Sequence, residues 1–177
     1  MKALLVVLLL PLGAHAEPVV SMDSLLERPM DTRLRDFSRL GDKAYSFLVR
    51  AAFDPSNSLL ARWRAVTTMG RLDPLRFRPE LDKALTSREW FMRNAALIAL
   101  QTDERPRATA GSIRMLQDKA LVVRTQAVRN LIELDARESE GLLWKEISDK
   151  RNYRGGESLW IRMHIAEALA RFASPGR

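Results

Sequence analysis

Residues 59–70 decide the fold, because their sequence, LLARWRAVTTMG, returns three times further along the chain. The related segments are WFMRNAALIAL at 90–100, LVVRTQAVRNL at 121–131 and LWIRMHIAEAL at 159–169. They align on Arg62, Arg93, Arg124 and Arg162, which are 31, 31 and 38 residues apart. A fainter copy around Arg33 and Leu40-Gly41 precedes them. Self-similarity at such a period is typical of chains that repeat one supersecondary unit.

The columns shared by the copies predict a helix in each of them. Three and seven residues past the arginine stand apolar residues: Ala65, Ala96, Ala127 and Ile165, then Met69, Leu100, Leu131 and Leu169. Positions 0, 3 and 7 lie on one face of a helix, so we expect this face to be buried. Six residues before the arginine stand acceptable N-cap types, Ser56, Ser87, Asp118 and Gly156. Thr86 and Glu89 also have the spacing of a capping box.

Shorter amphipathic stretches, expected to be helices, lie between these segments at 43–53, about 79–85, 110–116 and about 138–150. Turn signals such as Asp54-Pro55 and Asp73-Pro74 separate them from their partners. We place Pro79 at the first position of its helix, where its missing N–H costs nothing. The longer last interval coincides with NYRGG at 152–156, which we interpret as a lengthened loop. No strand-like alternation occurs, so the chain is predicted to be all-α.

The pattern of Asp-Pro, an apolar residue with Arg, Ala, and then Ala-Leu-Gly resembles the HEAT-like repeat, particularly its short bacterial form. The matching residues are Asp54-Pro55, Ala61-Arg62, Ala65 and Met69-Gly70; Met92-Arg93, Ala96 and Ala99-Leu100; Val123-Arg124, Ala127 and Leu131; Ile161-Arg162, Ile165 and Ala168-Leu169. The resemblance covers roughly residues 31–173. It implies a right-handed α-solenoid of stacked helix pairs, with the second helix of each pair on the concave face. It also implies that the recurring arginines are structural and reach a carbonyl or an acidic side chain between repeats.

The start of the chain is similar to a cleavable signal peptide. Lys2 precedes an apolar run at 3–12, and Ala14-His15-Ala16 suits signal peptidase, so we expect cleavage before Glu17. A retained anchor is the alternative, but the run is about half the roughly 20 residues that a membrane helix needs. The expected organisation is a signal peptide at 1–16, a segment at 17–30 that is a candidate for disorder, a repeat domain at 31–173 and a tail at 174–177. The expected location is periplasmic or secreted.

The composition argues against most enzyme classes. The chain has no cysteine, and His164 is the one histidine after the leader. Iron-binding hydroxylases built on HEAT-like repeats are recognised by His-Glu pairs, which are absent. Gly-x-Ser-x-Gly and phosphate-binding glycine loops are absent too. We interpret the carboxylates of Glu133, Asp135, Glu138 and Glu140 as caps and solvated charge. We therefore expect no catalysis, no cofactor and no metal.

The columns that vary between the copies are the candidates for recognition. Trp90 and Trp160 stand in first turns near apolar columns, and we expect both in the core. Trp63 stands in a column of mixed polarity, so it is the best candidate for an exposed aromatic anchor. The predicted partner-binding groove on the concave face comprises Trp63, Arg64, Asn94, Gln126, Arg129, His164 and Glu167, with Tyr153 and Arg154 on its rim.

These features favour an exported scaffold that binds a protein or peptide of unknown identity along its concave face. After removal of Lys2 the chain has 28 basic and 22 acidic residues, a net charge of +6. This charge supports an alternative, a basic envelope module that adheres to anionic lipid or cell-wall polymer. A lyase, similar to the HEAT-like enzymes that attach bilins, is a third hypothesis with no residue to support it. Export disfavours nucleic acid as a partner.

Overall fold

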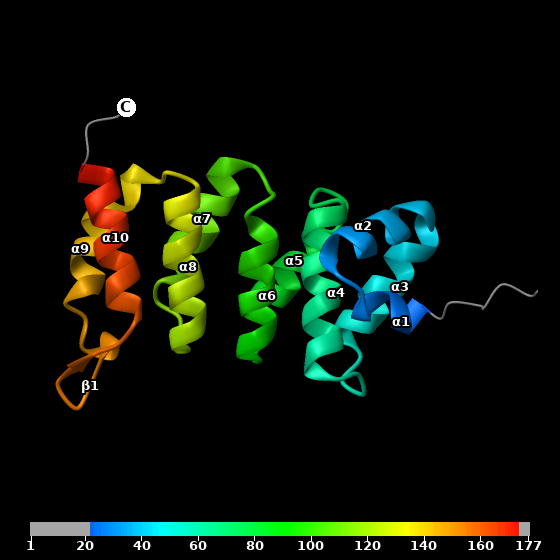
Figure 1. Cartoon of the computed structure of the whole chain (residues 1–177), viewed down its shortest axis with the longest axis horizontal. Coiled ribbons are helices and arrows are strands. Elements are labelled where there is room, and N and C mark those ends of the chain that lie inside the picture. Colours follow the sequence, from blue (N-terminus) through cyan, green and yellow to red (C-terminus); the bar gives the residue numbers. More distant parts are fainter. Residues whose placement is uncertain (1–21, 174–177) are drawn as a thin grey trace, which may run out of the picture.

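The computed structural model describes residues 22–173, and these are almost entirely helical (Figure 1). The α-helices are α1 Met22–Glu27, α2 Met30–Arg39, α3 Asp42–Phe53, α4 Leu59–Leu72, α5 Arg78–Leu85, α6 Trp90–Leu100, α7 Arg105–Met115, α8 Leu121–Glu133, α9 Glu140–Ile147 and α10 Ile161–Ala173. The prediction of an all-α chain is confirmed for this part. The expected signal peptide, its cleavage site and the tail at 174–177 lie outside the described residues. Within them, no helix has the length and apolarity needed to cross a membrane.

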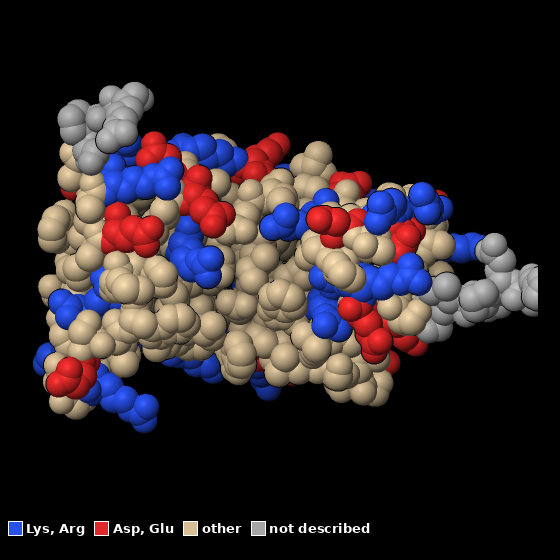
Figure 2. Space-filling view, viewed as in Figure 1, with Lys and Arg blue, Asp and Glu red and all other residues tan. Residues whose placement is uncertain are grey.

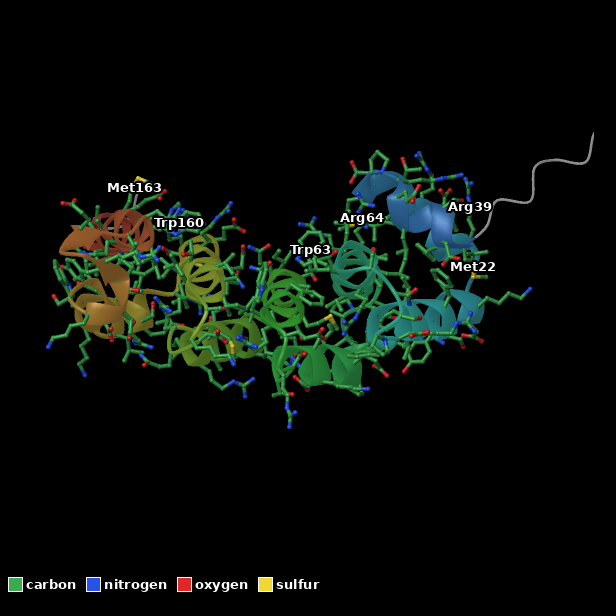
Figure 3. All side chains as sticks on the ribbon, turned by 90° about the horizontal axis from the view of Figure 1, so that it is seen from below. Met22, Arg39, Trp63, Arg64, Trp160 and Met163 are labelled. Carbon is green, nitrogen blue, oxygen red and sulfur yellow. The ribbon has the colours of Figure 1, made fainter. Side chains whose placement is uncertain are left out.

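The four helices that carry the recurring arginine lie side by side in chain order. Helix α4 contacts α6, α6 contacts α8, and α8 contacts α10. Each of these inner helices also packs on the helix before it, which gives the pairs α3–α4, α5–α6, α7–α8 and α9–α10. Figure 3 shows that the helices follow a shallow arc, with α4, α6, α8 and α10 on its inner side. The inner helices therefore form one continuous face.

The apolar columns that the repeated sequence predicts lie in the core. The residues three and seven past each arginine are at most 4% exposed. A very close contact joins α4 to α6, where a Cβ atom added to Gly70 would overlap the Cβ of Ala99 and lie 2.6 Å from its Cα. Thr102 closes this contact by donating a hydrogen bond to the carbonyl of Gly70 at 2.7 Å. Helix-to-helix packing thus depends on small residues at the predicted positions.

The outer helices depart from the predicted boundaries. Helix α7 begins at Arg105, before the expected start at 110, because Pro106 is accommodated in its first turn. Pro79 is the second helical residue of α5 rather than the first. The stretch at 138–150 is divided into a 3-10 turn at Arg137–Ser139, α9, and a second 3-10 turn at Lys150–Asn152. Part of the segment proposed as a candidate for disorder, 17–30, forms α1, which buries Leu25 and Leu26.

The predicted N-caps are displaced by two residues. The inner helices α4, α6 and α8 have Ser58, Glu89 and Ala120 as N-caps, and only Ser58 caps through its side chain. The expected capping box is also wrong, because the Thr86 hydroxyl donates back to α5 carbonyls. The polar residues upstream instead form tight turns, in which a side-chain oxygen accepts the N–H two residues later. These turns start at Asp54, Ser87, Asp118 and Asp149, with N···O distances of 2.8–3.2 Å.

The lengthened loop before α10 is confirmed, and it contains a small hairpin that the sequence did not predict. Strands β1 Tyr153–Arg154 and β2 Glu157–Ser158 pair antiparallel. Gly155 and Gly156 connect them with φ values of +58° and +87°. Two consecutive positive φ angles suit the turn of a two-residue hairpin and favour glycine at both positions. The hairpin follows the turn at Asp149 directly and leaves the register of α10 unchanged.

Candidate binding face

The recurring arginines join each inner helix to the loop that precedes the next one. Arg93 donates from Nε and Nη2 to the carboxylate of Asp118 at 2.6 and 2.8 Å. Arg62 binds the carboxylate of Glu89, and its Nε donates to the carbonyl of Ala52 at 3.0 Å. Arg124 donates to the side-chain oxygen of Asn152 and to the Arg151 carbonyl, at 2.9 and 3.0 Å. The structural interpretation of these arginines is confirmed by their contacts.

The same arginines also order the loop before their own helix. Arg93 Nη1 donates to the carbonyls of Ser87 and Arg88 at 2.8 and 3.0 Å. Arg124 Nη1 donates to the carbonyls of Asp118 and Lys119 at 3.0 and 3.3 Å. Burial lowers the pKa of Arg124, and the nearby charge of Arg151 lowers it further. The hydrogen-bond acceptors of the Arg124 guanidinium are carbonyl and amide oxygens, and none is a carboxylate.

Two residues of the predicted groove bond to each other across the inner face. Figure 3 shows Trp63 and Arg64 on the inner side of the arc. The Trp63 ring is half-buried, and its Nε1 donates to the Asn94 amide oxygen at 3.2 Å. Asn94 is 8% exposed. Trp63 is thus less exposed than the sequence suggested, and this pair links α4 to α6.

Gln126 is also placed between helices. It is 9% exposed, and its amide donates to the side-chain oxygen of Asn130 at 2.8 Å. Asn130 in turn donates to the carbonyl of Leu97 at 2.7 Å, which joins α8 to α6. A buried polar chain of this kind satisfies groups that would otherwise destabilise the core. Asn94 and Gln126 therefore lie below the surface of the expected groove.

Three predicted residues do come together, between α8 and α10. Arg129, His164 and Glu167 line a hollow of about 480 Å³ together with Ile132 and Glu133. His164 Nδ1 lies 3.5 Å from a carboxylate oxygen of Glu167. No ion pair engages the exposed side chain of Arg129 among the described residues. The hollow is lined by charges of both signs, and Ile132 contributes little accessible surface to it because it is only 8% exposed.

The remaining predicted residues lie apart from this hollow. Arg64 lines a separate hollow of about 280 Å³ with Asp23, Glu27 and Leu60, at the start of α4. Tyr153 is half-buried in the hairpin with its ring 4.3 Å from the guanidinium of Arg162, and Arg154 is exposed. The nine residues of the predicted groove are therefore distributed over separate sites on the inner face and the hairpin, and they do not form one groove.

The prediction that Trp90 and Trp160 belong to the core is wrong. They are 47% and 53% exposed, and the residues that follow them, Phe91 and Ile161, are buried instead. The first turns hold two adjacent apolar residues, and only one of them can face the core. Leu59, Leu60 and Met163 are exposed as well, at 49%, 49% and 65%. In Trp90-Phe91 and Trp160-Ile161 the first of two adjacent apolar residues is the exposed one, and this doubling is the sequence signal that was missed.

The carboxylates after α8 make surface contacts that agree with the interpretation as solvated charge. Glu133 accepts from the Gln101 amide at 2.9 Å, and Arg105 lies 3.4 Å from Glu138. Among residues 22–173, no three histidine, aspartate or glutamate side chains gather in a way that could hold a metal ion.

No family model matches this chain, and no curated protein matches it either.

Proposed function

We propose that this chain is an exported scaffold, a right-handed α-solenoid of HEAT-like helix pairs that binds a protein or peptide along its inner face. The successive contacts of α4, α6, α8 and α10 support the architecture. The arginines that link each inner helix to the next loop support it too, because a residue required in every repeat serves the repeat. The leader-like residues 1–16 support export.

The hollow between α8 and α10 is the observation that carries the binding role. Its lining comes from columns that differ between the repeats, in contrast to the buried columns that recur in all of them. Arg129, Glu133 and Glu167 surround Ile132 there with charges of both signs. Charged side chains of both signs select partners by complementary charge. A peptide segment that carries charges of both signs fits this lining.

Photo-crosslinking in cells that export the protein tests the proposal. A photoreactive residue at position 163, which is 65% exposed on α10, is compared with one at position 144, which is 58% exposed on the outer helix α9. We expect a discrete protein adduct from position 163 and none from position 144. The charge reversals Arg64→Glu and Arg129→Glu together should abolish the adduct and preserve helicity. Adducts that survive both reversals, or that arise equally from position 144, would show that this face is not the binding site.

A further inference from the structure

The loops that enter the inner helices share one turn and one exposed cation. Ser87, Asp118 and Asp149 each accept the N–H two residues later, and the residues between are Arg88, Lys119 and Lys150. These three cations are all exposed and recur every 31 residues. They lie at the end of the molecule where α6, α8 and α10 begin, along the lower edge in Figure 1. We call this surface the entry edge.

The carboxylates of these turns are each paired with an arginine of the chain. Glu89 is bound by Arg62, Asp118 by Arg93, and Asp149 by Arg151. In the part of the chain that the structure describes, no carboxylate forms an ion pair with Arg88, Lys119 or Lys150. Arg154 in the hairpin is exposed too, but it stands directly opposite the exposed Glu157, so the hairpin adds no net charge. The positive charge of the entry edge therefore comes from Arg88, Lys119 and Lys150.

Apolar side chains border these cations. Helical side chains tilt toward the N-terminus, so the first turns of the inner helices project their residues toward the entry edge. Leu59, Leu60, Trp90 and Trp160 stand there, each about half exposed. Figure 2 shows a broad uncharged area on the lower part of the inner face, with Lys and Arg atoms along its lower border. Tryptophan with adjacent basic residues is the composition of surfaces that lie at a membrane interface.

A shallow hollow on the entry edge offers a place for a phosphate. It measures about 410 Å³ and lies between the loops before α6 and α8. Arg88, Arg114 and Lys119 line it, and its one carboxylate, Asp118, is already held by Arg93. Three cations without a free carboxylate form a site for an anionic group.

We propose that the entry edge docks on the surface of a bilayer that contains anionic phospholipids. Arg88, Lys119 and Lys150 contact lipid phosphates, and Trp90 and Trp160 enter the interfacial layer. The positive edge selects an anionic surface, and the apolar row selects one with an accessible apolar interior, which a polysaccharide or an acidic protein does not provide. The hollow between α8 and α10 adjoins this edge at Trp160, whose ring meets the His164 ring edge-on with 6.4 Å between the centroids.

Vesicle sedimentation with matched charge variants tests the proposal. The protein is the chain from Glu17 onward, which keeps all the described helices and their core. The vesicles contain equal parts of phosphatidylglycerol and phosphatidylethanolamine, with phosphatidylcholine vesicles for comparison. The edge variant changes Arg88, Lys119 and Lys150 to Gln. The control changes three exposed cations at the opposite end of the inner helices to Gln: Lys43, Arg71 and Arg171.

We expect the wild-type chain to bind the anionic vesicles only, and less strongly as salt is added. Each basic residue near an anionic surface contributes roughly fivefold in binding, so the edge variant should bind roughly 100-fold more weakly. The control variant should lose much less, although its net charge is the same. Equal losses in the two variants would mean diffuse attraction and would overturn the proposal, as would binding to phosphatidylcholine or no binding at all. Retention of polyglutamate with no vesicle binding would assign the edge to an acidic polypeptide instead.

The tryptophans provide a second readout. Changing Trp90 and Trp160 to Ala should weaken vesicle binding and remove the blue shift of tryptophan emission that vesicles cause. Trp144→Ala is the matched control, because Trp144 is 58% exposed on the outer helix α9. Circular dichroism before binding confirms that each variant is folded. An unchanged blue shift in the double variant would show that these side chains do not enter the membrane.

Discussion

Replacement of Asp118 by Ala tests whether the arginine links hold the inner helices together. The carboxylate accepts from Arg93 at 2.6 and 2.8 Å and from the Ala120 N–H at 2.8 Å. Both side chains of the pair are 7% exposed. Removal of one partner from a buried pair costs about 3–5 kcal/mol, because the other charge stays buried. Arg93 keeps its bonds to two backbone carbonyls, so we expect the lower end, about 3 kcal/mol.

The assay is denaturant unfolding followed by circular dichroism, with Asp42→Ala as the control. Asp42 pairs with Arg76 at 2.7 Å, but its side chain is 92% exposed. An exposed pair of this kind contributes about 0–1 kcal/mol. Adding Arg93→Met to Asp118→Ala removes the unpaired cation and should restore part of the stability. A loss below about 1 kcal/mol, or one equal to that of the control, would refute the role assigned to this pair.

The pH dependence of the Asp118→Ala effect has a defined sign. Burial alone would raise the pKa of Asp118, but the hydrogen bonds from Arg93 and from the Ala120 N–H lower it below its ordinary value of 3.8. A carboxyl whose pKa is lower in the folded state stabilises the fold above its unfolded pKa, and this contribution disappears as the pH falls through the folded pKa. The difference between wild type and variant should therefore be constant near neutral pH and shrink in acid below about pH 4. A difference that persisted unchanged in strong acid would contradict this account.

Three further predictions concern packing, a buried bond and export. Gly70→Ala should destabilise the fold by about 3 kcal/mol in denaturant unfolding, because the added methyl overlaps the backbone of α6. In the same assay Gly141→Ala should stabilise the fold by about 0.5 kcal/mol, because its methyl meets nothing within 4 Å. Trp63→Phe should cost about 1 kcal/mol by leaving the Asn94 amide oxygen without its donor, and unchanged denaturant midpoints would argue against that bond. Mass spectrometry of the protein from the envelope fraction should give a chain that starts at Glu17, and a mass that includes the leader would favour a retained anchor.

The inner helices could be predicted from the sequence because their buried residues recur at positions 0, 3 and 7 from the arginine, which lie on one face of a helix. The signal at each position is weak, but Ala65, Ala96 and Ala127 align in copies of equal length. The caps could not be predicted so well, since Ser, Thr and Asp favour both N-caps and the tight turns that precede them. Here Asp118 forms the turn and binds Arg93, and Ala120 takes the cap position.

The candidate site could be predicted only in part, because the helical period does not distinguish half-buried from exposed columns. Arg129, His164 and Glu167 were grouped from their varying columns, and the structure brings these three together in one hollow. Asn94 was not recognised as buried, because its partner, Trp63, is on a neighbouring helix and not within its own repeat. The burial of such a residue depends on contacts between neighbouring helices, so it cannot be read from the sequence of one repeat.

The hairpin at 153–158 indicates where this chain can change in length. It is inserted after the turn at Asp149, and Asn152 still donates to the Glu146 carbonyl and accepts from Arg124. The helices on both sides keep their columns in register, so the added residues extend outward without a change in the core. The junction between an entry turn and its inner helix is thus a permissive site, where an epitope or a fluorescent label between Gly155 and Gly156 should leave folding intact.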